Sequence, residues 1–112
     1  MDVASRLLDC IGARDFDGIA ACFADDASMR VLTPHQLREM AGPAEAADRF
    51  RAWFGGMEGF ALLDCDTAQV LDRVRIRWHT RVLDPAKGWQ ENEHTAYAEV
   101  HDDRIVALNV TC

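Results

Sequence analysis

The amino-acid sequence predicts an α+β fold, with three helices in the first half of the chain and an antiparallel sheet in the second half. Two observations predict this class. Apolar residues recur at helical spacing up to residue 54, and from residue 60 to the end their period changes to two. With 112 residues the chain can build one apolar core but not two, so residues 1–112 are interpreted as one domain.

The first two helices are predicted from apolar spacing and from one capping residue. The first helix has four apolar residues on one side, which are Val3, Leu7, Leu8 and Ile11. Asp15 is placed to cap a second helix, because a carboxylate can accept hydrogen bonds from the first free amides. The apolar face of that helix consists of Phe16, Ile19, Ala20 and Phe23. The acidic pair Asp25 and Asp26 is expected to end it.

A short strand and a third helix follow. Residues 28–32 alternate between apolar and polar side chains, which predicts a strand, and a loop is expected from Thr33 to His35. Gly42 and Pro43 are expected to start the third helix, and the pair Gly55-Gly56 to stop it. One face of this helix carries Ala46, Phe50, Trp53 and Phe54.

Three turn signals, at residues 72–73, 84–88 and 102–103, divide the second half into four strands. Because these strands are sequential, an antiparallel meander is the simplest topology. If Leu83 pairs with Trp89, arginines face glutamates on one side of the sheet, and Trp78 lies opposite His94 on the other side. The second side is mainly apolar and is expected to face inward. In the last strand the expected core residues are Val106, Leu108, Val110 and Cys112.

Charge and composition disfavour several classes of partner. The formal net charge is −7, which disfavours nucleic acids and anionic membranes. The sequence has no apolar run of about 20 residues and no signal-peptide pattern at its start, which predicts a cytoplasmic protein. Its four cysteines and four histidines show no metal-binding spacing. We therefore expect reduced thiols, no metal and no cofactor.

The stretch LLDCIGARDFDGIAACFADDASMRV resembles the opening of nuclear transport factor 2-like proteins, in which the second helix starts with a D-hydrophobic-D-x-hydrophobic pattern and closes in F-x-D-D. The resemblance continues through Gly42-Pro43 and through DDRIVALNV, which looks like the final hairpin of these domains. It implies a cone-shaped roll in which a strongly bent sheet wraps three helices around an apolar pocket. Related proteins of the SnoaL-like and ketosteroid isomerase-like kind include isomerases, polyketide cyclases, epoxide hydrolases, dehydratases and non-catalytic modules, so the fold alone gives no function.

The resemblance also places a candidate ligand pocket. Its expected lining is Met29, Val31, His35, Phe50, Trp53, Phe54, Trp78, Ala96 and Leu108. Ketosteroid isomerases use a tyrosine, a protonated carboxylic acid and an aspartate base. In this sequence the corresponding positions are Leu7, Ala96 and Val31, so that mechanism is excluded.

His94 and Asn92 are the candidate catalytic residues, because strand parity points both inward. A histidine packed against an indole should stay neutral, and a neutral imidazole can accept a proton from a carbon acid or a water. The alternative is a core histidine that is hydrogen-bonded to a neighbouring strand or to Asn92. Asp64 and Asp66 are expected either at the surface or as carboxylate partners of a histidine, whereas His79 and His101 are expected to face outward or lie in a turn.

Two functions remain open from the sequence. The first is a pocket protein that binds a small hydrophobic or polyketide-like molecule, with a cofactor-free acid/base reaction of the isomerase, cyclase or dehydratase type. The second is a non-catalytic homodimerisation or accessory module. In that case the outer sheet face, with its arginines, glutamates and Tyr97, meets a second copy of the chain.

Overall fold

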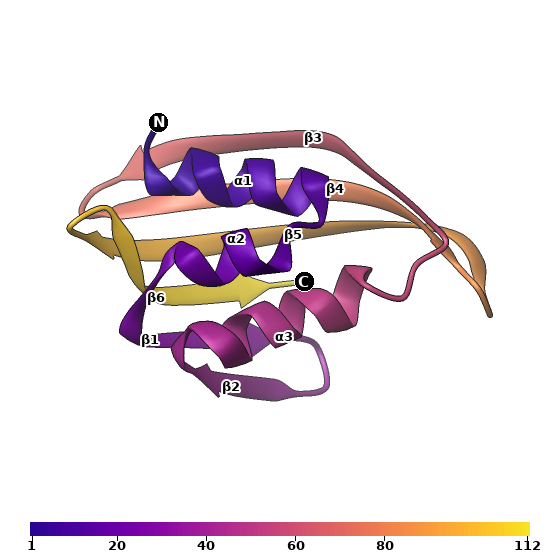
Figure 1. Ribbon diagram of the computed structural model, residues 1–112, viewed down its shortest axis with the longest axis horizontal. Coiled ribbons are helices and arrows are strands. Elements are labelled where there is room, and N and C mark those ends of the chain that lie inside the picture. The colour runs from indigo at the N-terminus through magenta and orange to yellow at the C-terminus, as the bar shows by residue number, and fades with distance from the viewer.

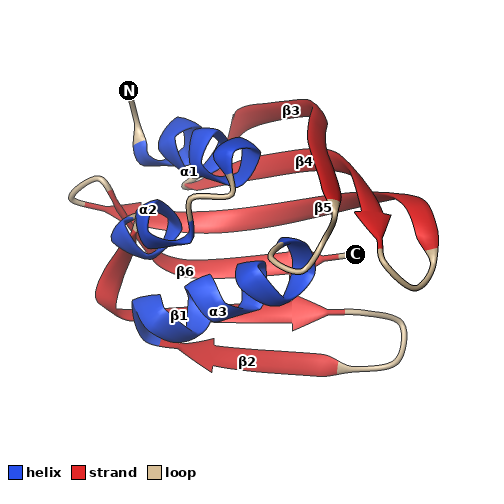
Figure 2. Cartoon of the chain, turned by 45° about the vertical axis from the view of Figure 1, so that its right-hand side comes forward, coloured by secondary structure: helices blue, strands red, loops and turns tan.

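The structure, a computed structural model, describes residues 1–112 as three helices and one six-stranded sheet (Figure 1). The helices are α1 (Val3–Ala13), α2 (Phe16–Ala21) and α3 (Gly42–Phe54). The strands are β1 (Phe23–Leu32), β2 (Leu37–Ala41), β3 (Gly59–Val70), β4 (Arg73–Asp84), β5 (Gly88–His101) and β6 (Arg104–Thr111). All three helices cover one face of the sheet, and the other face is bare (Figure 2). The predicted α+β class is confirmed.

The sheet is mixed, with the strand order β2-β1-β6-β5-β4-β3. The last four strands form the expected antiparallel meander. β1 then pairs parallel to β6, and β2 folds back antiparallel onto β1. The parallel pair closes the fold, because it brings residues 23–32 against residues 105–111.

The helix ends are fixed by side-chain hydrogen bonds. Asp15 accepts a bond from the amide of Gly18 at 2.9 Å, which confirms the predicted cap of α2. Asp103, in the turn between β5 and β6, accepts a hydrogen bond from the amide of Val3 at 3.0 Å. It also forms an ion pair with Arg6 at 2.7 Å. These contacts tie the start of α1 to the sheet. None of the three helices has both the length and the apolar composition needed to cross a membrane.

The predicted register between β4 and β5 is confirmed: Leu83 pairs with Trp89, and Trp78 pairs with His94. The same register places Val74, Ile76, Trp78, Thr80 and Val82 on the side that faces the helices. The core consists of 24 apolar residues, and its largest fully buried side chains are Trp78, Phe23, Phe50 and Phe54. The inner face of the meander therefore carries the candidate site.

Two features of the strands in the first half of the chain differ from the prediction. α2 ends at Ala21 and β1 begins at Phe23, so Asp25 and Asp26 lie in a strand rather than at a helix end. This part of β1 is irregular, with a register shift between Phe23 and Ser28, and it therefore lacks a clean apolar alternation. β2 is not predicted by the sequence pattern either, because only one of its five residues, Met40, is buried.

The core face of β6 also differs from the prediction. Ile105, Leu108 and Val110 are buried, whereas Val106 is only half-buried and Cys112 is exposed. Opposite β5, the register shifts so that Val106 becomes the extra residue of a bulge. A bulge reverses the side-chain parity on one side of it. Strict alternation therefore holds only for the second half of this strand.

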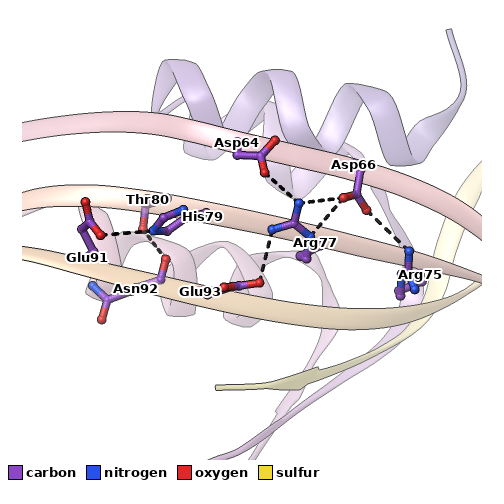
Figure 3. A network of polar contacts seen from close by, with 9 residues as sticks. All are labelled: Asp64, Asp66, Arg75, Arg77, His79, Thr80, Glu91, Asn92 and Glu93. Atoms are coloured by element: carbon purple, nitrogen blue, oxygen red, sulfur yellow. Dashed lines mark hydrogen bonds and ion pairs between the residues drawn. The ribbon is translucent and has the colours of Figure 1, made fainter.

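The uncovered face of the sheet carries a network of ion pairs (Figure 3). Arg77 is at its centre and donates to Asp64 at 2.8 Å, to Asp66 at 2.7 Å and to Glu93 at 3.2 Å. The Arg77 guanidinium holds the pKa of the Asp64 carboxyl below its usual range. Of the two readings of Asp64 and Asp66, the structure supports the surface one, with arginine rather than histidine as their partner.

Candidate functional site

Three rings from two strands and one helix stack on the inner face of the sheet, and we call them the histidine–tryptophan cluster: Trp53, Trp78 and His94. The His94 ring centroid lies 4.7 Å from that of Trp53 and 5.4 Å from that of Trp78. Trp78 is stacked nearly parallel to the imidazole, with 20° between the planes, and Trp53 is tilted by 38°. Phe50 packs against both indoles, edge-on to Trp53 at 5.3 Å and at 5.7 Å from Trp78.

The cluster forms because two kinds of periodicity meet there. Trp78 and His94 are cross-strand partners on the apolar face of the meander. Phe50 and Trp53 are three residues apart on α3 and so lie on one side of that helix. The end of α3 is held in place by Arg14, which donates to the carbonyls of Phe54 at 3.2 Å and Met57 at 3.0 Å.

His94 is buried, with 6% of its surface exposed, and burial lowers the pKa of its imidazole from 6.5 to about 4. Loss of solvation is the sole cause, since no charged group acts on the ring. At neutral pH the imidazole is therefore uncharged and has one donor and one acceptor nitrogen. This agrees with the predicted neutral state.

Two polar atoms of the cluster have no hydrogen-bond partner. These are Nδ1 of His94 and Nε1 of Trp78, and both are buried. A buried polar atom without a partner costs roughly 1–3 kcal/mol, and most such atoms in proteins are paired. For this nitrogen, the alternative of a core histidine that is hydrogen-bonded to a neighbouring strand or to Asn92 is therefore not supported. A bound molecule could supply the missing hydrogen-bond partner.

The structure brings together most of the predicted site residues but not all of them. Phe50, Phe54, Trp53, Trp78 and His94 form one group of contacting rings. The remaining apolar members are buried on the inner sheet face, and they are Met29, Val31, Ala96 and Leu108. These side chains pack with one another as core.

Asn92 and His35 do not lie where the sequence predicts. Asn92 has the expected parity, but its side chain is exposed, whereas that of its cross-strand partner Thr80 is buried. Only its backbone carbonyl takes part in the interior, where it accepts from the hydroxyl of Thr80 at 3.4 Å. His35 was predicted to line the pocket, but it is exposed in the turn between β1 and β2 and does not belong to the histidine–tryptophan cluster.

The cavity in the structure lies at another place, next to the start of α1. It has a volume of about 450 Å³, and its lining includes Asp2, Ala4, Gln69, Asp72 and Val100. None of the residues predicted to form the ligand pocket lines it. The space around His94 is instead filled by aromatic rings. No three His, Cys, Asp or Glu side chains lie close enough together to hold a metal ion.

Sequence reasoning missed three residues that shape the site. Phe60 packs against Phe54 with the ring centroids 5.0 Å apart and the planes tilted by 57°, and Arg14 holds the end of α3. Thr80, two residues after Trp78 on β4, is fully buried. Strand parity placed Thr80 inward, so a signal existed for it. The role of Arg14 depends on two helices meeting in space, and no local pattern reveals it.

These features define the class of the protein as an α+β roll of the nuclear transport factor 2-like and ketosteroid isomerase-like kind. Its family follows from the sequence itself. Residues 4–108 match the model of the SnoaL-like domain, and the chain belongs to that family. A comparison with curated proteins finds no match.

Three solved structures illustrate the fold. An uncharacterised cystatin-fold protein from Novosphingobium aromaticivorans has 17% identity and a TM-score of 0.74, with 96% of this chain and 93% of that chain covered. A proposed polyketide cyclase from Xanthomonas campestris has 15% identity and a TM-score of 0.77, covering 98% and 87%. A limonene epoxide hydrolase-like epoxide hydrolase from Mycobacterium tuberculosis has 17% identity and a TM-score of 0.71, covering 97% and 78%. At these identities the likeness shows the fold alone.

Proposed function

We propose that this SnoaL-like protein binds a small hydrophobic, polyketide-like molecule at the histidine–tryptophan cluster. The observation that carries the proposal is the buried, neutral His94, whose Nδ1 has no partner inside the protein. Small-molecule sites are usually lined by aromatic side chains with a few polar atoms, and the cluster has this composition, although in this structure its rings fill the space around His94. One of the structural neighbours is named as a proposed polyketide cyclase, which is consistent with a polyketide-like ligand.

His94 is the candidate proton acceptor for a cofactor-free reaction of the isomerase, cyclase or dehydratase type. At neutral pH the imidazole is uncharged and offers a lone pair, but its low pKa makes it a weak base until a negative charge develops beside it. The proton would pass to a ring nitrogen either from a carbon acid of the ligand, which becomes a carbanion or enolate, or from a water, whose hydroxide adds to the ligand, so that the negative charge ends on the ligand in both cases. That charge would in turn stabilise the imidazolium, since an opposite charge nearby raises the pKa of a histidine. The proton then returns to the product.

A thermal-shift screen tests the binding part of this proposal. We expect at least one polyketide-like or steroid-like compound to raise the Tm of the wild type and to leave that of His94→Ala unchanged. At ten times its Kd a ligand stabilises the folded state by about 1.4 kcal/mol, which amounts to several degrees for a domain of this size. His101→Ala, which changes an exposed histidine at the end of β5, should respond like the wild type. If no compound acts, or if His94→Ala responds equally, the proposal fails.

The bare face of the sheet favours a second proposal, which is that two copies of the chain associate through it. The chain as a whole carries a net charge of −7, but on this face four arginines of β4 stand among five acidic residues of β3 and β5. Two copies can therefore approach here with less repulsion than elsewhere. Tyr97 lies in the middle of the face and is 38% exposed.

Light scattering after size exclusion measures this association. We expect a dimer for the wild type and a monomer for Tyr97→Glu, which adds a negative charge at the centre of the contact. Leu71→Glu, at an exposed turn between β3 and β4, is the matched control and should remain a dimer. A monomeric wild type contradicts the proposal.

A further inference from the structure

Two of the four cysteines meet where α1 packs against α2. Cys10 lies in the second half of α1 and is half-buried, and Cys22 is the C-cap of α2 and is buried. The end of α1, a turn and all of α2 separate them along the chain, so the fold rather than the sequence spacing brings them together. The other two cysteines, Cys65 and Cys112, are exposed.

Gly18 of α2 makes the approach of the two thiols possible. A side-chain carbon at Gly18 would lie 2.7 Å from the sulfur of Cys10, which is shorter than van der Waals contact allows. The thiol of Cys22 donates to the carbonyl of Gly18 at 3.4 Å. Both sulfurs therefore border the same residue, and they lie within hydrogen-bonding reach of each other. Glycine is the residue that lets the sulfur of Cys10 come this close to the backbone of α2.

The surroundings of the two thiols make them slow to react. Burial raises the pKa of the Cys10 thiol, and the carboxylates of Asp15 and Asp9 raise it further. Burial also raises the pKa of the Cys22 thiol to about 11, and the guanidinium of Arg6 partly opposes this rise. Because the thiolate is the reactive form, both thiols are weak nucleophiles at neutral pH. Only Cys10 is partly exposed, so a reagent in solution meets it first.

We propose that Cys10 and Cys22 form a reversible disulfide by exchange with a small-molecule disulfide. The thiolate of Cys10 attacks one sulfur of the reagent, which forms a mixed disulfide and releases one thiol. The thiolate of Cys22 then attacks the sulfur of Cys10, which forms the bond within the protein and releases the second thiol. Two electrons and two protons pass from the protein to the reagent, so one disulfide is exchanged for another and two thiols leave.

This disulfide would link α1 to the point where the sheet closes. Cys22 directly precedes β1, and its carbonyl accepts a hydrogen bond from the amide of Ile105 on β6 at 2.9 Å. A bond from Cys10 to Cys22 therefore joins the second half of α1 to the start of the parallel pair of β1 and β6. It also constrains the unfolded chain, so the oxidised protein should be more stable than the reduced one.

Exchange with glutathione, carried to equilibrium, tests the pair without depending on its rate. The protein is Cys65→Ser/Cys112→Ser, a full-length chain that lacks the two exposed thiols. It is incubated with reduced and oxidised glutathione at about pH 8, blocked with N-ethylmaleimide, digested and analysed by mass spectrometry. We expect the peptides joined through Cys10 and Cys22 to exceed mixed disulfides with glutathione by about tenfold. Oxidation should raise the Tm by about 5 °C or more, and reduction should reverse the rise.

Two single substitutions in the same background are the matched controls. Cys22→Ser should form only the mixed disulfide at Cys10, and Cys10→Ser should stay largely unmodified because Cys22 is buried. Neither should gain stability on oxidation. Mixed disulfides without the joined peptides overturn the proposal, and so does a chain that remains fully reduced at equilibrium. If the joined peptides form only in urea, the native fold holds the two sulfurs apart and the proposal is wrong.

Discussion

Acidification from pH 7 to pH 4 should destabilise the wild-type protein by roughly 3 kcal/mol more than a His94→Phe variant. The imidazole of His94 has a pKa of about 4 in the folded state against 6.5 as its ordinary value. Between these two values the unfolded chain binds a proton that the folded protein does not. The free energy of unfolding therefore falls as the pH is lowered through this window, and the contribution of His94 is complete below about pH 4.

Urea denaturation at a series of pH values measures this effect. Asp2, Asp64 and Asp103 also have lowered pKa values, so their contribution to the stability of the protein is lost in acid. Because both proteins contain them, this contribution cancels in the comparison. The same substitution at an exposed position, His35→Phe, should keep the wild-type pH profile. Parallel profiles for the wild type and His94→Phe would show that His94 is not held neutral by burial.

Removal of the Trp78 side chain should strongly destabilise the protein. Trp78 is fully buried in the sheet and contacts both Phe50 and His94. Replacing a buried tryptophan by alanine costs about 3–5 kcal/mol, since both the transfer energy and the packing around the cavity are lost. Domains of this size are stable by about 5–15 kcal/mol, so Trp78→Ala should bring the protein close to unfolding.

Chemical denaturation of Trp78→Ala and Trp89→Ala gives the comparison. Trp89 is 54% exposed, and the guanidinium of Arg81 lies 4.2 Å from its ring centroid. Its loss should cost about 1 kcal/mol or less, because an exposed cation–π contact contributes little. Similar losses for the two variants would mean that Trp78 does not anchor the core.

The elements with a regular period could be predicted from the sequence. The helices have a clear apolar face, and Asp15 marks the start of α2 as a cap. The register of β4 and β5 follows from a short turn and from opposite charges on one face, and with it came the contact of Trp78 with His94. Each of these conclusions depends on neighbours in sequence or on directly paired strands.

The remaining features depend on contacts that no local pattern encodes. The bulge that makes Val106 an extra residue is set by pairing with β5, and it reversed the predicted core face of half of β6. β2 exists because it pairs with β1, not because of its own side chains. Parity placed Asn92 inward, but its side chain is exposed while that of its cross-strand partner Thr80 is buried. In the candidate site, the contact of Trp53 with His94 depends on how α3 lies across the sheet.

The parallel pair of β1 and β6 constrains the order in which a new chain can fold. Residues 23–32 leave the ribosome early, yet their partner strand is made of residues 105–111, near the end of the chain. Until that segment emerges, the hairpin of β1 and β2 has no neighbour in the sheet, and one edge of β5 is open. The pairing of β1 with β6, which joins the two parts of the sheet, can therefore form only after β6 has been synthesised. Because this pairing joins residues that are far apart in the sequence, we expect the domain to fold slowly and to reach its native structure late.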